Sequence, residues 1–191
     1  MHPSAYVLGG TFLGLNGRAG QRILEIGSAN VNGSLRDHQP EGSTWIGVDQ
    51  AEGAGVDVVG SSHELPFEDG SFDLVVSTSC LEHDPLFWIT FLEVARVLRP
   101  GALAYLNVPA KGPYHAHPVD CWRFYPDSGA ALALWARRSG REMHLVETFA
   151  AGSRGHQEWI DLALVFVRGE GEAEGYRPLR GTVTEKAEAV V

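Results

Sequence analysis

The side chains with the greatest chemical potential gather in one short segment, AKGPYHAHPVDCWRFYPD, which spans residues 110–127. Two histidines, His115 and His117, lie close to an acid, Asp120, and a base, Arg123. An imidazole has an unperturbed pKa of about 6.5, so either histidine suits the removal of a proton near neutral pH. We expect this segment to bind a substrate and to supply a general base. The side chains expected to contact the substrate are Tyr114, Asp120, Trp122, Arg123 and Tyr125.

Two other interpretations of this segment stay open. Its aromatic side chains can pack against one another, and Asp120 can form an internal ion pair with Arg123. His115, His117 and Asp120 can also converge on a divalent cation, for which imidazole ligands favour Zn²⁺ or a late transition metal over Mg²⁺. Because the spacing H-x-H-x-x-D is not specific for metal ligation, we predict no metal site.

The elements that must position this segment are short apolar runs rich in Val, Ile and Leu. Such runs are typical of strands buried on both faces of a parallel sheet. The five predicted strands are Arg22–Ile26, Thr44–Val48, Val56–Val59, Phe72–Ser77 and Leu103–Val108. In a parallel sheet the loops after the strands share one edge, so the segment after Leu103–Val108 meets the loops after the earlier strands there.

Helical spacing follows the fourth strand, in DPLFWITFLEVARVLRPG at residues 84–101, and again at Asp127–Arg138. Two further strands are predicted at His144–Phe149 and Leu162–Arg168. The connection between them is too short for a crossover helix, so they should pair as an antiparallel hairpin. The predicted fold is α/β, with strands alternating with helices in a doubly wound, Rossmann-like, mostly parallel sheet that ends in an antiparallel strand hairpin.

Composition limits the kind of protein. The 191 residues suffice for one domain, which we place at residues 1–168, followed by a Gly- and Glu-rich tail at residues 169–191 that we expect to be poorly packed. The 15 basic residues against 24 acidic ones, a net charge of −9, argue against a nucleic acid partner. No signal peptide or membrane span is recognisable, and the two cysteines are too few for a disulfide framework, so we expect a cytoplasmic protein without a membrane partner.

The stretch ILEIGSANVNG, residues 23–33, ends the first strand at the edge where such sheets bind nucleotides. A dinucleotide fingerprint would need glycines where Ala29 and Asn32 stand, and the chain has no P-loop motif. The stretch therefore argues against a dinucleotide and against phosphate binding of the P-loop kind.

Several stretches in order resemble the class I S-adenosylmethionine (SAM) dependent methyltransferases, particularly the small-molecule group called type 11. They are Glu25 and Gly27, Asp49 after the second strand, SSHELPFEDGSFDLVVSTSCLEH at residues 61–83, and EVARVLRPGALAYLNVP at residues 93–109. The first motif departs from the usual E-x-G-x-G-x-G at Ala29 and Val31, and SANVNGS resembles a subgroup that uses N-G-S. The resemblance implies a methyltransferase domain with SAM as its cofactor.

SAM joins an adenosine to a charged amino acid, and the expected contacts follow from that structure. Asp49 can accept both ribose hydroxyls, Gly27 lets the backbone approach the ligand, and Glu25 can orient the loop or attract the ammonium group through water. Ser61 or Ser62 is expected near the adenine amino group, where the family commonly has an acid. The remaining residues expected along the cofactor are Ser28, Asn32 and Gln50.

The loop after the fourth strand, STSCLEH, is expected to face the sulfonium, as its family counterparts do. Ser79 and Cys80 are predicted to line the cofactor cleft. His83 is a third candidate for the catalytic base, although Glu82 and His83 can instead simply begin a helix.

Three functions remain open. The first is a SAM-dependent methyltransferase that acts on an oxygen or nitrogen of a small molecule, for example a sugar or an antibiotic-type metabolite in small-molecule biosynthesis. The second is a SAM-binding cyclase or eliminase without methyl transfer, and the third is a non-catalytic partner subunit with the same fold. A homodimer that completes the site is a further option.

Overall fold

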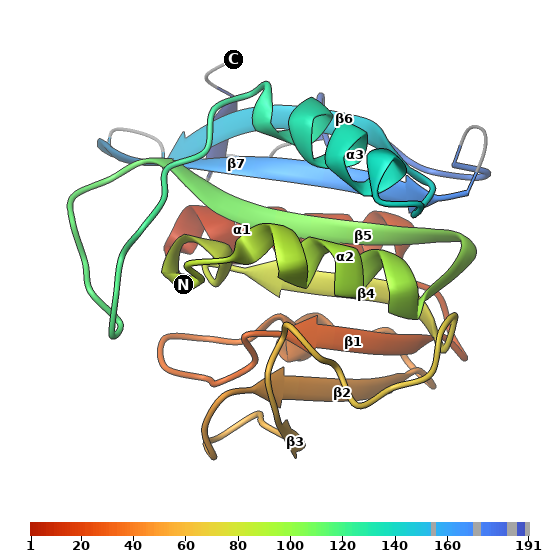
Figure 1. The fold of residues 1–191 in the computed structure, drawn as a ribbon. Coiled ribbons are helices and arrows are strands. Elements are labelled where there is room, and N and C mark those ends of the chain that lie inside the picture. The colour runs from red at the N-terminus through yellow and green to blue at the C-terminus, as the bar shows by residue number, and fades with distance from the viewer. Residues whose placement is uncertain (154–155, 170–172, 183–186, 190–191) are drawn as a thin grey trace.

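A computed structural model describes residues 1–153, 156–169, 173–182 and 187–189 of the chain. One mixed sheet runs through the molecule in the strand order β3-β2-β1-β4-β5-β7-β6-β8 (Figure 1). The first five strands are parallel to one another, and β7 is antiparallel to both β5 and β6. The strands are β1 (Arg22–Ile26), β2 (Thr44–Asp49), β3 (Val58–Val59), β4 (Phe72–Thr78), β5 (Leu98–Lys111), β6 (Met143–Ser153), β7 (His156–Arg168) and β8 (Ala187–Ala189).

The predicted fold class is confirmed. The order places β1 and β4 side by side at the centre, which is the switch point of a doubly wound sheet. The terminal hairpin forms as expected, with Phe149 opposite Ala163 in the antiparallel β6–β7 pair. Its strands are longer than predicted, because β6 continues to Ser153 and β7 begins at His156.

Helices cover the two faces of the sheet unequally (Figure 1). The amphipathic helix α2 (Phe87–Val97) and the helix α3 (Ser128–Arg138) pack on one face, where Phe91 and Leu132 join the larger apolar core. Helix α1 (Pro3–Asn16) packs on the other face, where Phe12 stacks on Tyr105 with ring centroids 4.6 Å apart.

The expected alternation of strands and helices is wrong at the start of the chain. Residues 27–43 connect β1 to β2 with only the short 3₁₀ turn η1 (Leu35–His38), and no element was predicted where α1 forms. Helix α1 covers the sheet in place of a crossover helix. The approach of η1 depends on Gly9, where a Cβ atom would lie 2.4 Å from Cδ2 of Leu35.

The expectation of a poorly packed tail is wrong for residues 173–182. Leu179 is fully buried in the core beneath α1, and the hydroxyl of Tyr176 donates a hydrogen bond to Glu147. The backbone N–H of Arg177 donates to Oδ1 of Asn16 at 2.8 Å. These contacts bind residues 173–182 to α1 and β6. This segment therefore packs as part of the domain, on the far side of the boundary expected at residue 168.

The described helices include none that combines the length and the apolar character needed to cross a membrane.

Candidate active site

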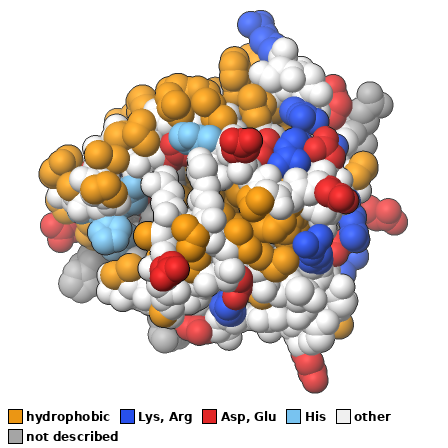
Figure 2. Space-filling model, turned by 60° about the horizontal axis from the view of Figure 1, so that its bottom comes forward, with side chains coloured by type: hydrophobic (Ala, Val, Ile, Leu, Met, Phe, Trp, Pro, Cys, Tyr) orange, Lys and Arg blue, Asp and Glu red, His pale blue; other side chains and the backbone are white. Residues whose placement is uncertain are grey.

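The predicted site residues lie in the last residues of the parallel strands or in the loops that follow them. These strand ends form the edge from which the loop after β5 projects (Figure 1). That loop, residues 112–127, is called the acceptor loop below. On the face shown in Figure 2, the histidine side chains lie toward the left and most Lys and Arg side chains toward the right, with hydrophobic side chains at the left and across the middle.

Gly27 sits where the loops after β1 and β4 touch. Its φ is +75°, and a Cβ atom there would lie 2.5 Å from Sγ and 2.6 Å from Cβ of Cys80. Both its N–H and that of Ser28 donate to the carbonyl of Val48, at 3.0 and 3.1 Å. The glycine is therefore required twice, by the left-handed backbone and by the neighbouring thiol.

Asp49 joins the end of β2 to the loop after β1. Its Oδ2 accepts the backbone N–H of Ala29 at 3.0 Å, and its Oδ1 accepts the N–H of Gln50 at 2.7 Å. The residue stays partly exposed. Because an ionised carboxylate has about four acceptor positions, two remain for ribose hydroxyls.

Glu25 is buried below this loop, and Nε1 of Trp45 donates to its Oε2 at 3.0 Å. Burial raises the pKa of Glu25 to about 7, against smaller opposing effects from Trp45, Arg36, the backbone of Leu35 and Ser34. Of the two predicted roles, the contacts favour the one in which Glu25 orients the loop.

The other expected cofactor residues differ in their surroundings. Ser28 and Ser79 have buried hydroxyls without a hydrogen-bond partner among the described residues, and the φ of Ser79 is +50°. Asn32 and Gln50 are exposed. Burial, reinforced by neighbouring carboxylates, raises the pKa of the Cys80 thiol to about 12, so the side chain is a neutral thiol.

The two serines after β3 already have partners inside the protein. Oγ of Ser61 accepts the N–H of His63 at 3.1 Å, and the hydroxyl of Ser62 donates to Oγ1 of Thr90 at 2.9 Å. Thr90 in turn donates to Asp84 at 2.6 Å, and Asp84 contacts Nε2 of His63 at 2.7 Å. This polar network around Asp84 was not predicted.

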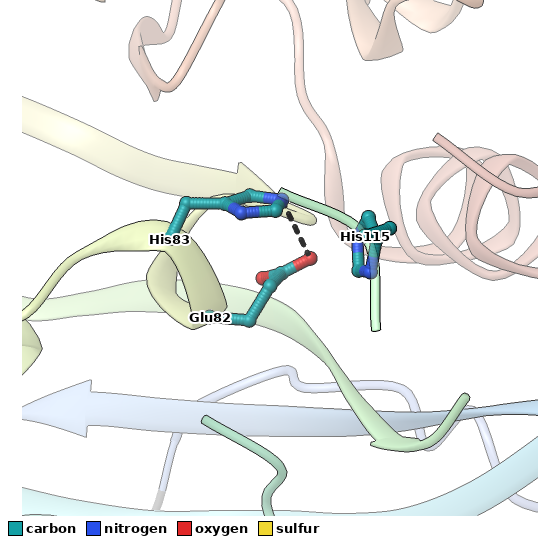
Figure 3. A group of neighbouring side chains, drawn as sticks. All are labelled: Glu82, His83 and His115. Carbon is teal, nitrogen blue, oxygen red and sulfur yellow. Dashed lines mark ion pairs between the residues drawn. The ribbon is translucent and has the colours of Figure 1, made fainter. Parts of the chain in front are cut away.

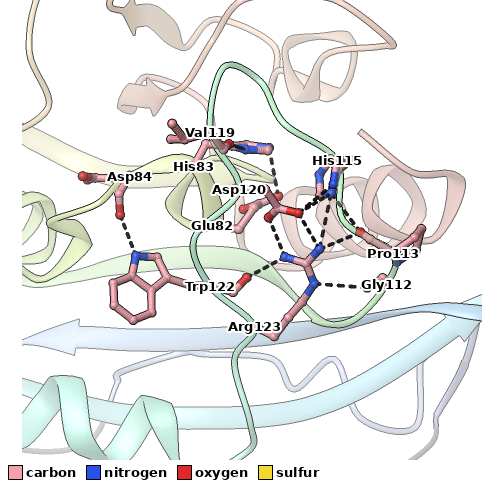
Figure 4. Close-up of polar contacts among 10 residues, drawn as sticks. All are labelled: Glu82, His83, Asp84, Gly112, Pro113, His115, Val119, Asp120, Trp122 and Arg123. Atoms are coloured by element: carbon pink, nitrogen blue, oxygen red, sulfur yellow. Dashed lines mark hydrogen bonds and ion pairs between the residues drawn. The ribbon is translucent and has the colours of Figure 1, made fainter.

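The acceptor loop is organised by the internal ion pair that the sequence left open (Figure 4). Arg123 binds both carboxylate oxygens of Asp120, at 2.6 and 2.7 Å, and also donates to the carbonyl of Pro113 at 2.7 Å. The guanidinium holds the pKa of Asp120 well below its usual range. Both residues were expected to bind the substrate, but their donors and acceptors serve the loop itself.

Of the three aromatic residues expected to contact the substrate, one packs against a neighbouring ring and two are exposed. Trp122 packs against Phe87, with ring centroids 5.4 Å apart, and its Nε1 donates to the carbonyl of Asp84 at 2.9 Å. Tyr114 and Tyr125 are 76% and 72% exposed. Trp122 is therefore a packing residue of the loop base, and the two tyrosines lie on its surface.

Glu82, His83 and His115 form a cluster at the base of the acceptor loop (Figure 3). Glu82 and His83 belong to the 3₁₀ turn η2 (Leu81–His83), which follows β4. The rings of His83 and His115 meet edge to face, 4.8 Å apart, and Nε2 of His83 lies 3.7 Å from Oε1 of Glu82. Glu82 is 1% exposed, and burial raises its pKa to about 8.

His117, the other predicted base, is exposed, and its ring lies 6.2 Å from that of His83. His115 is better held, because its Nδ1 lies 3.2 Å from Oδ2 of Asp120 and its ring lies 4.9 Å from that of Trp159. A Cβ atom at Gly112 would lie 2.2 Å from the Trp159 ring, so the glycine lets Trp159 reach the loop.

Glu82 is the main site residue that the sequence analysis missed as a ligand or catalytic group. It was interpreted only as a helix start. The signal that could have identified it is an acid placed directly after a central strand, beside a histidine, at the edge that carries the other polar residues.

Sheet order, helices on both faces and a polar edge at the switch point define a doubly wound, Rossmann-like α/β protein, a class whose ligands bind at that edge. Residues 27–106 match the family described as a methyltransferase domain. Over these residues the chain is similar to class I SAM-dependent methyltransferase domains, which agrees with the family and the cofactor expected from the sequence.

Individual relatives agree with this assignment. An uncharacterised methyltransferase of Mycobacterium marinum is 33% identical over 135 residues, which are 70% of this chain and 52% of the relative. A 27-O-demethylrifamycin SV methyltransferase of Amycolatopsis mediterranei is 36% identical over 100 residues, 44% of this chain and 37% of the relative. The chain thus spans about half the length of the first curated relatives it matches.

A solved structure shares the fold. It is the 1,6-didemethyltoxoflavin-N1-methyltransferase of Burkholderia thailandensis with bound 1,6-didemethyltoxoflavin and S-adenosylhomocysteine (SAH). The TM-score is 0.68 at 16% identity, over 87% of this chain and 80% of the other.

Proposed function

We propose that this protein transfers the methyl group of SAM to an oxygen or nitrogen atom of a small molecule. The observation that carries the proposal is the cluster of Glu82, His83 and His115 beside Cys80 and the loop after β1. Groups that bind the cofactor and groups that handle a proton thereby share one edge of the sheet.

The residues present fit SAM in this arrangement. Asp49 keeps free acceptor positions for the ribose, and Gly27 leaves the backbone open to close approach. The unpaired buried hydroxyls of Ser28 and Ser79 are candidate partners of the methionine end. Ser61 and Ser62 are retained as the predicted adenine contacts, through backbone groups rather than through hydroxyls that already have partners.

The proposed step is an in-line displacement. The acceptor oxygen or nitrogen forms a bond to the methyl carbon while the carbon–sulfur bond breaks, and SAH leaves as a neutral thioether. The acceptor proton goes to a group of the cluster. His115 is the best placed of the three predicted bases, because Asp120 orients its ring. Alignment of donor and acceptor by the loop supplies much of the remaining acceleration.

A small acceptor is supported by the names of one relative, a 27-O-demethylrifamycin SV methyltransferase, and of one structural neighbour, a 1,6-didemethyltoxoflavin-N1-methyltransferase. The net charge of −9 opposes the binding of a nucleic acid. A sugar or antibiotic-type metabolite is therefore the class to test first. A cytoplasmic location and a homodimer that completes the site remain predictions from the sequence.

The test has two parts. Calorimetry measures the binding of SAM and SAH to the protein, and a coupled assay counts SAH formed with panels of phenols, sugars and amines. Binding together with acceptor-dependent SAH formation is the expected result. Absence of SAM binding would favour a partner subunit, whereas conversion of an acceptor without SAH would favour the cyclase or eliminase.

A further inference from the structure

We propose that Glu82, His83 and His115 form a binding site for one divalent transition-metal ion, with Zn²⁺ as the best-matched ion. The site differs from the one considered in the sequence, which combined His115, His117 and Asp120. Asp120 is held by Arg123, and His117 lies outside the cluster, whereas Glu82 and His83 lie inside it.

The spacing of the three side chains suits a shared ion (Figure 3). One ring nitrogen of each histidine and a carboxylate oxygen of Glu82 all lie within 4.8 Å of one another. Ligands about 2.1 Å from a tetrahedral Zn²⁺ lie about 3.4 Å apart. Nε2 of His83 and Oε1 of Glu82 are 3.7 Å apart, so only small side-chain movements are needed.

The surroundings of both histidines prepare the ring for ligation (Figure 4). Nδ1 of His83 lies 2.5 Å from the carbonyl of Val119, and Nδ1 of His115 lies 3.2 Å from Asp120 and 3.3 Å from the carbonyl of Pro113. Because the carbonyl of Val119 only accepts, Nδ1 of His83 carries the proton and its Nε2 keeps the lone pair. Nδ1 of His115 has these two oxygens beside it and also lies 3.4 Å from Nη2 of Arg123, so its two acceptor contacts are opposed by one donor. Ligating histidines typically have such an oxygen partner behind the ring.

Glu82 supplies the second argument. It is almost completely buried, and its Oε2 has no hydrogen-bond partner among the described residues. A buried carboxylate without a partner is costly, and a cation between it and the two imidazoles would satisfy it. The backbone carbonyl of Glu82 accepts the N–H of Cys121 at 2.7 Å, which fixes the turn below the acceptor loop.

The donor set selects the ion. Two imidazoles and one carboxylate favour Zn²⁺ or a late first-row metal, whereas Mg²⁺ and Ca²⁺ prefer oxygen donors. Three protein ligands also leave one position open. Only the catalytic use of this site rests on the proposed function: an acceptor hydroxyl bound at the open position would release its proton to solvent more easily, and the histidines would act as ligands instead of bases.

The test measures metal binding without SAM or acceptor. Tag-free protein is stripped with a chelator and titrated with Zn²⁺ against an indicator, and its metal content is measured after dialysis. We expect one Zn²⁺ per chain in the wild type. Glu82→Gln and His115→Ala should each weaken binding by at least about 100-fold, because a direct ligand matters more than its outer partners. His144→Ala, at the opposite end of the sheet, should bind as the wild type does.

Co²⁺ loading of the wild type gives a second measurement that does not depend on the folding of any variant. A strong visible absorption of a four-coordinate Co²⁺ site, lost on addition of Zn²⁺, is expected. Weak binding by the wild type, or equal binding by Glu82→Gln and the wild type, would overturn the metal site. Tight metal binding without SAH formation would overturn only the proposed function, and chelator-resistant methyl transfer by metal-free protein would overturn only a catalytic role of the metal.

Discussion

The carboxylate of Asp49 accepts the backbone N–H of Ala29 at 3.0 Å, so the end of β2 holds the loop that follows β1. One side chain therefore shapes the cofactor loop and is expected to bind the ribose. We predict that Asp49→Ala weakens SAM binding by about 2 to 3 kcal/mol, because charge-assisted hydrogen bonds are lost on both sides. Calorimetry checks this, with Asp37→Ala on the surface of η1 as the control. Unchanged SAM affinity in folded Asp49→Ala protein would contradict the placement.

Gly27→Ala should reduce both stability and SAM affinity. The new methyl group would lie 2.5 Å from Sγ of Cys80, and overpacking of this kind costs about 1 to 3 kcal/mol. Gly20→Ala is a matched control, because Gly20 has a similar φ of +77° but no atom within 4 Å of the added Cβ. Chemical denaturation measures the unfolding free energy of both variants. The difference between their losses is the cost of the contact with Cys80, because both carry similar backbone strain. Equal losses in both would show that the contact with Cys80 is unimportant.

His115→Ala should lower turnover by about 10²- to 10⁴-fold, whichever way the cluster activates the acceptor, and leave SAM affinity unchanged. His117→Ala should have a smaller effect, since its ring is exposed and farther from His83. Steady-state turnover and calorimetric SAM affinity are measured for both and for His144→Ala. Full activity of His115→Ala would remove this histidine from the mechanism.

The stability of the protein should depend on the ionisation of Glu25. Burial raises its pKa from 4.5 to about 7 in the folded state, so its contribution is fully present below about pH 4.5 and is lost as the pH rises through 7. The loss is on the order of 3 kcal/mol. Glu25→Gln should flatten that part of the curve of unfolding free energy against pH, measured by urea denaturation between pH 5 and 8. A variant curve parallel to that of the wild type would contradict the assignment.

Leu179→Ala should destabilise the protein by about 2 to 5 kcal/mol, because the leucine is fully buried. Val31→Ala, at a position that is 63% exposed, should change stability by less than about 0.5 kcal/mol. The urea midpoints of the two variants measure these changes in stability. A change at Leu179 as small as that at Val31 would restore the expectation of a loosely packed tail.

The sheet was predictable because a strand buried on both faces needs an unbroken apolar run. Arg22–Ile26 and Thr44–Val48 were identified almost to the residue. Helix α1 was missed because its glycines lower helix propensity, although Gly9 is what lets Leu35 pack closely. Leu179 was missed because composition describes the average of a segment, whereas one leucine and one tyrosine anchor this one.

The candidate site was predictable in its location but less so in its contacts. The topology brings the loops after β1, β4 and β5 to one edge, so Gly27, Cys80 and His115 were expected there. Spacing along the chain cannot show that Arg123 turns inward to Asp120, or that Glu82 is buried beside two histidines. Those outcomes depend on which polar groups find partners once the loops have packed.

The acceptor loop has a fixed base and an open tip. The N–H groups of Cys121 and Trp122 bond to the carbonyl of Glu82, and Nε1 of Trp122 bonds to that of Asp84, while Tyr114 and His117 project into solvent. Sequence changes at the exposed positions 114 and 116–118, which leave out His115, can therefore accumulate without disturbing the groups below them. A library of substitutions confined to these tip positions should therefore change which small molecules bind as acceptors, while the fold and the side chains of the cluster stay unchanged.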